Sequence, residues 1–194
     1  MHFQLTLKKS PFAIILLCIY FLFLCNTASA EPPDDIIWKS LETKHTIIHY
    51  QNEKELKKFH VRIDYGPKSR GLKRLFSSSA PDNLEEIVIE KVDILFKRVQ
   101  KILGMRKKME KVNVNVYQDK DQLHKAFMMI YRTKCHLRAW YRYKNNTVYV
   151  NVRDLHEGML AHELAHAIID HYLLVRPPRA TAEILARYVD SHLK

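Results

Sequence analysis

The stretch "MLAHELAHAIIDHY" (residues 159–172) places two histidines four residues apart, with a glutamate directly after the first. Residues four apart lie on one face of an α-helix, one turn along, so His162 and His166 can direct ring nitrogens at a single metal ion. Glu163 lies about 100° further round the helix. It stands beside such an ion rather than on it, where a general base takes a proton from water. The stretch therefore predicts a helix with a metal-binding face.

A third ligand is needed to distinguish this pattern from chance. His-Glu-x-x-His on a helix is typical of zinc metalloproteases, but a chain with 11 histidines can contain it accidentally. Catalytic zinc takes three protein ligands and keeps a fourth position for water. Asp170 shares the histidine face, yet it lies about 12 Å along the axis from His162 and cannot reach the same ion. A histidine six residues after His166 would serve, but Tyr172 stands there.

The segment after this helix offers a glutamate instead. Pro177 and Pro178 force the chain to turn, and "TAEILARYVDSHL" (residues 181–193) predicts a further helix. If that helix folds back against the first, Glu183, 17 residues after His166, comes to the metal side.

These two segments resemble a known group of enzymes. "HELAH…AEILARYV" resembles the gluzincin branch of zinc peptidases, in which a glutamate on the following helix completes the site. Residues 183–189 are similar to the "E-G-L-A-E-Y" run of bacterial peptidase MA-like domains, and "HELAHAIID" is similar to the active helix of thermolysin-like enzymes. The similarity extends loosely over most of the chain, but only residues 157–190 carry specific motifs.

The resemblance implies a zinc metallopeptidase that acts on a peptide or protein substrate. It makes His162, His166 and Glu183 the ligands of one Zn²⁺ ion and Glu163 the catalytic base. Tyr172 is the candidate that stabilises the oxyanion, because related enzymes use a tyrosine or histidine there.

The chain also departs from the family pattern. Arg187 stands where the second acidic residue of the run is expected. Asp170 or Asp190 can orient a ligand histidine instead, although a surface or capping role is the expectation for both. Tyr188 is expected to pack between the two helices.

The first 30 residues have the pattern of a secretory signal peptide. Lys8 and Lys9 precede an uncharged apolar run, and "ASA" (residues 28–30) offers a cleavage site. We expect export to the periplasm or medium after cleavage near Ala30, leaving residues 31–194 as one peptidase domain. A retained N-terminal membrane anchor is the alternative, but the apolar run is short for a span.

The net charge indicates which classes of binding partner are expected, and the cysteine content indicates whether a reactive thiol is expected. Without the leader, 30 basic and 21 acidic residues give a net charge of +9, spread along the chain. Since no nucleic-acid module is present, we expect no nucleic-acid partner, and an anionic envelope surface is the better counterpart. Cys135 is then a lone cysteine, and we expect it to be an inert thiol.

The remaining pattern predicts an α+β fold with a small mixed or antiparallel sheet. Each predicted element is a range read from hydrophobic periodicity: strands at 44–52, 59–66 and 111–119; a hairpin at 137–152; helices at 82–104, 119–132, 154–174 and 178–193. Asp154 and Glu157 are expected to form a capping box. The hairpin's first strand either binds an extended substrate at an exposed edge or buries Trp140 and Tyr141 in the core.

Two other functions remain open. One is a zinc-stabilised binding protein of the cell envelope that has little or no turnover, although a structural metal site has no need of Glu163. The other is a metal-free basic module that binds envelope polymers.

Overall fold

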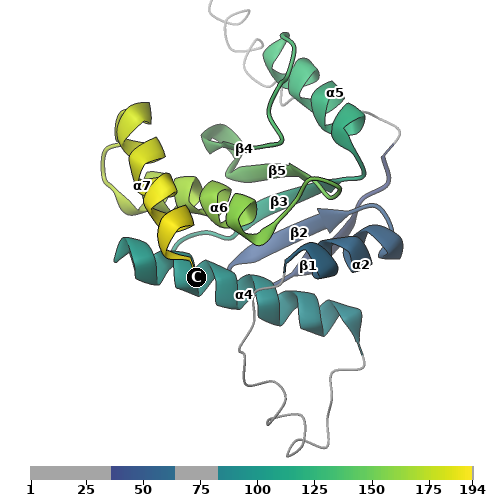
Figure 1. Cartoon of the computed structure of the whole chain (residues 1–194), viewed down its shortest axis with the longest axis horizontal. Helices are drawn as coiled ribbons and strands as arrows, with labels where there is room; N and C mark the ends of the chain where they lie inside the picture. The colour runs from purple at the N-terminus through teal and green to yellow at the C-terminus, as the bar shows by residue number, and fades with distance from the viewer. Residues whose placement is uncertain (1–35, 64–82, 194) are drawn as a thin grey trace, which may run out of the picture. The chain divides into compact units, whose positions relative to one another are not determined.

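A five-stranded mixed sheet organises the computed structural model, which describes residues 36–63 and 83–193 (Figure 1). These residues belong to a single unit, Pro33–Lys194. The signal peptide predicted at residues 1–30 lies outside the described residues, and so do residues 66–80, whose glycine, proline and serine content predicts a surface loop. None of the helices within the described ranges is long and apolar enough to cross a membrane.

The strands are arranged in the order β1-β2-β3-β5-β4. The three central strands run parallel, and each edge strand pairs antiparallel with its neighbour. Their bounds are β1 Lys39–Glu42, β2 Thr46–Tyr50, β3 Val112–Tyr117, β4 Ala139–Arg142 and β5 Thr147–Asn151. The predicted hairpin at 137–152 is confirmed, and its first strand, β4, is an edge of the sheet.

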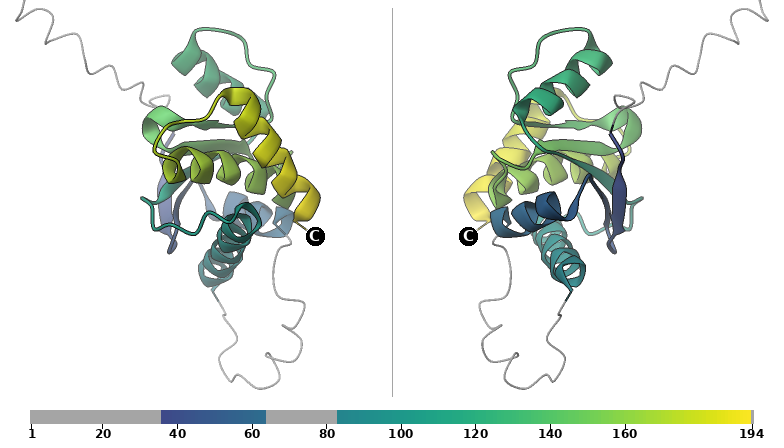
Figure 2. Two further views of the ribbon diagram at one scale, coloured as in Figure 1. Left: turned by 90° about the vertical axis from the view of Figure 1, so that its left-hand side faces the viewer. Right: turned by 90° about the vertical axis from the view of Figure 1, so that its right-hand side faces the viewer.

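Helices cover both faces of the sheet, which gives the predicted α+β class (Figure 2). The larger core packs one face against α2 Glu53–Arg62, α4 Leu84–Leu103, α6 Glu157–Tyr172 and α7 Arg179–His192. The other face packs its aromatic side chains against α5 Lys120–Tyr131. Because side chains alternate along a strand, Ala139 of β4 faces the large core while Trp140 faces the aromatic cluster.

Helix α4 follows the predicted pattern closely. Asn83 caps its start by accepting a hydrogen bond from the N–H of Glu85. Gly104 ends it with φ of 70°, a left-handed conformation that favours glycine. Buried Val92 and Leu95 face the sheet, so this helix is a structural element of the core.

The strand predicted at 59–66 is wrong where the structure describes it, because residues 59–62 belong to α2. Asn52 caps this helix by accepting from the N–H of Glu55. Leu56, Phe59 and Ile63 are buried at three- and four-residue steps, and this helical spacing outweighs the strand-like alternation through Val61, which is exposed.

Candidate metal centre

Helix α6 begins at a cap different from the one predicted. The ring Nδ1 of His156 accepts a hydrogen bond from the N–H of Met159 (3.1 Å), so His156 is the N-cap. Asp154 is not available for the predicted capping box, because it accepts from the Asn151 side chain in the preceding turn (3.0 Å). The helix therefore runs from Glu157 to Tyr172, inside the predicted range of 154–174.

Helix α7 packs against α6 and brings the third candidate ligand to the histidines. Ala182, Ala186 and Val189 are buried on its inner face, and their small side chains allow a close approach to the alanines of α6. Glu183 lies beside this inner face, so its carboxylate reaches across to His162 and His166. The fold-back predicted from the two prolines is confirmed by these contacts.

The three side chains form a compact cluster that could hold a metal ion. The Nε2 atoms of His162 and His166 are 3.2 Å apart. Glu183 places Oε2 at 3.5 Å from the first nitrogen and Oε1 at 3.6 Å from the second. Ligand atoms about 2.0–2.1 Å from a tetrahedral zinc ion are separated by roughly 3.3–3.4 Å, so the spacing fits.

The cluster is open on one side. The side chains of His162, His166 and Glu183 are 21, 15 and 34% exposed. Within residues 36–63 and 83–193 no fourth histidine, cysteine or carboxylate joins them. Structural zinc sites are closed by four protein ligands, whereas catalytic sites keep one position for water. The arrangement is therefore that of a three-ligand site.

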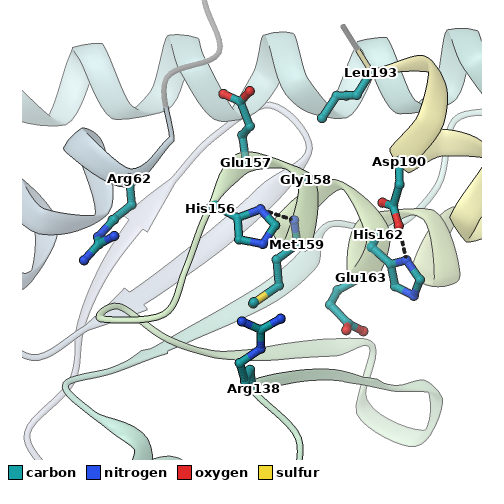
Figure 3. A pocket seen from close by; sticks show the side chains of 10 residues that line it. All are labelled: Arg62, Arg138, His156, Glu157, Gly158, Met159, His162, Glu163, Asp190 and Leu193. Atoms are coloured by element: carbon teal, nitrogen blue, oxygen red, sulfur yellow. Dashed lines mark hydrogen bonds and ion pairs between the residues drawn. The ribbon is translucent and has the colours of Figure 1, made fainter.

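Asp190 contacts one of the clustered histidines, which corrects the expectation of a mere surface charge. Its Oδ2 lies 3.0 Å from Nδ1 of His162 (Figure 3). A carboxylate at this distance holds the proton on Nδ1 and leaves the Nε2 lone pair free for a metal. Asp190 follows Glu183 by two helical turns, and Arg187, one turn earlier, is exposed.

Asp170 does not touch the ligand cluster. It is buried and its carboxylate accepts from Nε of Arg176 at 3.0 Å. The expectation that it is solvated is therefore wrong. Its ion pair ties the end of α6 to the connection that leads into α7.

Burial controls the protonation of the groups in the centre. Desolvation lowers the pKa of His166, and the neighbouring His162 lowers it further, which keeps the ring neutral and able to bind a metal. Desolvation raises the pKa of Glu163 to about 7, aided by the negative charges of Glu183 and Asp190. A carboxylate that titrates near neutral pH suits a general base.

Glu163 is buried and contacts strand β4, an edge strand of the sheet among the described residues. Its carboxylate accepts a hydrogen bond from the backbone N–H of Tyr141, a residue of edge strand β4. That N–H therefore points to α6 rather than into the ladder with β5. The residue predicted as the base thus sits where an extended chain alongside β4 would pass.

The structure contradicts the prediction for Tyr188 and does not test the one for Tyr172. Tyr188 is 48% exposed and stacks on His192, with ring centroids 4.0 Å apart, so its predicted place between the helices is wrong. Tyr172 is the last residue of α6 and 38% exposed, about 9 Å along the axis from His166. Its role as oxyanion donor stays a prediction.

A pocket of about 610 Å³ adjoins the metal centre (Figure 3). His162, Glu163 and Asp190 form one end, and the side chains of Arg62 and Arg138 line the wall beyond. Neither arginine was predicted as a site residue, because nothing in the local sequence around either one marks it as part of a pocket. Only the fold brings the end of α2 and the start of β4 to the same cavity.

The remaining candidates lie away from the centre. Cys135 is a free, buried thiol whose pKa is raised by desolvation, consistent with an inert role. Trp140 is buried in the aromatic cluster, stacked on Tyr149 with centroids 4.7 Å apart. Strand β4 thus exposes an edge and also contributes to a core.

Comparison of the chain with protein-family models, curated proteins and solved structures found no match to any of them. The functional argument therefore depends on the geometry of the site.

Proposed function

We propose that the protein is an exported zinc metallopeptidase that hydrolyses peptide bonds. The observation that carries the proposal is the triangle of ligand atoms at 3.2, 3.5 and 3.6 Å with a buried glutamate next to it on the same helix. Two imidazole nitrogens and one carboxylate are the ligand set of gluzincin-type catalytic zinc. When bound, zinc polarises a carbonyl group and lowers the pKa of a water molecule.

The residues of the chain have separate tasks in this reaction. His162, His166 and Glu183 hold the ion, and Asp190 keeps the His162 ring in the tautomer that binds it. The Glu163 carboxylate accepts a proton from the attacking water and returns it to the nitrogen of the leaving amine. Its pKa of about 7 suits both transfers.

The exposed edge of β4 supports a peptide as the substrate. Strand β4 pairs only with β5 among the described strands, so its outer edge can hydrogen-bond to an extended chain. Glu163 contacts that edge through Tyr141. A peptide paired with β4 would carry its backbone past the proposed base.

The position of Tyr172 favours one alternative function, a zinc-binding protein without catalysis. Tyr172 is six residues beyond the second histidine, on the last turn of α6. At this distance it is not an evident donor for the oxyanion, and the site then has Glu163 as its one evident catalytic group. In the alternative, the chain is a zinc-stabilised binding protein with negligible turnover. The anionic envelope surface also stays a prediction for the basic chain.

Zinc content and cleavage test the proposal together. The untagged protein, produced from the full chain, should hold about one zinc per chain, and it should cleave a mixed peptide library. Glu163→Gln should reduce cleavage by roughly 10²–10⁴-fold while retaining zinc. Glu86→Gln makes the same chemical change at an exposed position of α4 and should leave the rate unchanged.

The outcomes separate the alternatives. Equal and negligible cleavage by the wild type and Glu163→Gln, with zinc bound in both, would establish the binding protein. Absence of zinc in the wild type after mixing with the metal and desalting would overturn the metal centre itself.

A further inference from the structure

The pocket beside the metal centre combines two free cationic side chains with an opening to the site. We propose that Arg138, assisted by Arg62, binds a carboxylate group of the substrate, so that the peptidase selects acidic peptides. This inference names the substrate class of the proposed peptidase and therefore rests on that function. Arg138 points into the pocket toward Met159 of α6 (Figure 3).

Both arginines lack a partner among residues 36–63 and 83–193. Neither Arg62 nor Arg138 forms a hydrogen bond or ion pair there. By contrast, Arg176 pairs with Asp170, and Arg98 donates to the carbonyl of His192. Both residues are exposed and line the same cavity from separate elements. Their guanidinium groups are suited to an external anion, because guanidinium binds carboxylate in a bidentate manner.

The acidic residues of the pocket do not neutralise these arginines. Asp190 is bound to His162, and Glu163 lies against the Tyr141 N–H at the metal end. The Glu157 side chain points away from Arg138 in Figure 3. The arginine wall therefore remains positive while the metal end holds the negative groups.

The position of Arg138 relative to β4 predicts where in the substrate the carboxylate lies. Arg138 directly precedes Ala139, the first residue of β4, and Glu163 contacts the same strand at Tyr141. Three residues of extended chain span about 10 Å. A peptide paired along β4 with its scissile bond at Glu163 would therefore place a side chain beside Arg138 within about three residues of that bond.

A carboxylate in a peptide has two sources, an acidic side chain or a free C-terminus. Both present the same two oxygens to a guanidinium group. The probes are therefore three pools of N-acetylated octapeptides whose other positions are random among uncharged residues. One pool contains glutamate at each position in turn with an amidated C-terminus, the second contains glutamine instead, and the third contains glutamine with a free C-terminus.

Binding to the metal-free protein is measured by competition against a fluorescent peptide from the glutamate pool, so that it does not depend on catalysis. One of the two carboxylate-bearing pools should bind about tenfold more tightly than the amidated glutamine pool. That pool identifies the source: the glutamate pool points to a side chain, and the free-C-terminus pool to the chain end. The zinc-loaded wild type should cleave the same pool preferentially.

The variants assign the preference to the arginine wall. Arg138→Gln should remove most of it, and Arg62→Gln should reduce it. Arg138→Glu should reverse it in favour of a fourth pool, which is amidated and has lysine in place of glutamate, and an unfolded variant cannot show such a reversal. Arg106→Gln, an equal charge change at an exposed position outside the pocket, should retain the wild-type preference.

Failure of this inference differs from failure of the peptidase proposal. Glu163-dependent cleavage without any carboxylate preference in binding would overturn the carboxylate pocket and leave the peptidase intact. A preference that Arg138→Gln removes, in a protein that never cleaves, would support the pocket and overturn the peptidase. A preference unchanged in Arg138→Gln and Arg138→Glu would also overturn the assignment to Arg138.

Discussion

Helices α4 and α6 pack on the same face of the sheet, but they bury different kinds of side chain. The hydrogen-bond donors of two buried polar side chains of α4 are satisfied by backbone carbonyls. The Lys91 ammonium donates to two of them, and the Gln100 amide donates to the carbonyl of Lys107. Helix α6 instead buries the carboxylate of Glu163, which has no ion pair with a lysine or arginine among residues 36–63 and 83–193, and brings the Nε2 atoms of His162 and His166 to 3.2 Å from each other.

The contrast separates what stabilises the fold from what performs the chemistry. In α4 the buried ammonium and amide groups have hydrogen-bond partners, so their burial leaves no donor unsatisfied. In α6 the carboxylates of Glu183 and Asp190 lie near the buried carboxylate of Glu163, which is unfavourable until a cation lies among them. The sharpest tests of this contrast change one helix and measure both properties.

Removal of a ligand from the α6–α7 centre should have the largest effect. His162→Ala and Glu183→Ala should each weaken zinc binding by about a hundredfold or more, because each deletes one of three bonds to the ion. Competition with a chromophoric chelator measures the affinity. His136→Ala, at an exposed histidine outside the cluster, should bind zinc as the wild type does; an unchanged Glu183→Ala would show that α7 supplies no ligand.

A cavity in the core beside α4 should lower the stability of the fold and leave zinc binding unchanged. Leu95→Ala removes a fully buried side chain and should lower the free energy of unfolding by about 3 kcal/mol, as measured by urea denaturation of the metal-free protein. Its zinc affinity in the folded state should be unchanged. Ile184→Ala, at a position of α7 that is 67% exposed, should change stability by less than about 0.5 kcal/mol. A comparable loss in both variants would contradict the role given to α4.

The same contrast explains which parts could be predicted from the sequence. Helix α4 has apolar residues at helical steps and a glycine at its end, so local signals and tertiary packing agree. His162, Glu163 and His166 lie on one helix, where spacing alone fixes their geometry. Glu183 could be predicted because the two prolines force a turn between the helices, so that α7 can fold back against α6.

The errors arose where local patterns compete or where tertiary contacts decide. Val61 and Ile63 alternate as in a strand, while Leu56, Phe59 and Ile63 have helical spacing, and the Asn52 cap favours the helix. The asparagine was the signal that could have settled the choice. His156 replaced the predicted acidic cap because Asp154 is held in the preceding turn.

The contact of Asp190 with His162 and the shared pocket of Arg62 and Arg138 depend on tertiary structure, so no single segment of the sequence predicts them. Asp190 lies two turns after Glu183, so a shared helix face was readable, but its 3.0 Å contact with His162 depends on how α7 crosses α6. Arg62 and Arg138 belong to separate elements, and no local spacing relates them.

The orienting carboxylate offers a test within the centre. Asp190→Ala should weaken zinc binding by about 10–100-fold, because Nδ1 of His162 loses its partner and the ring its fixed orientation. Asp190→Asn, which keeps an oxygen to accept the Nδ1 proton, should fall between this variant and the wild type. The free energy of unfolding of the metal-free protein should hardly change. Asp121→Ala, at an exposed aspartate of α5, is the matched control, and equal affinities in all four proteins would remove Asp190 from the site.

Glu163 itself gives the most direct measure of the stability that α6 loses by burying a carboxylate. Burial raises the pKa of its carboxyl from 4.5 to about 7 in the metal-free protein. The folded state therefore binds this proton more tightly than the unfolded chain, and its stability falls as pH rises from about 4.5 through 7. Glu163→Gln cannot ionise and should be more stable than the wild type by up to about 3 kcal/mol at pH 8, because each unit of the pKa shift corresponds to about 1.4 kcal/mol.

The difference between Glu163→Gln and the wild type should disappear below about pH 4, where Glu163 is protonated in both the folded and the unfolded chain. Urea denaturation of the metal-free proteins across this range measures it, with Glu86→Gln expected to show no such pH dependence. A Glu163→Gln protein less stable than the wild type at pH 8 would mean that the carboxylate stabilises α6, and the contrast with α4 would fail. A stabilised variant that has also lost peptide cleavage would show that the same buried charge costs stability and supports catalysis.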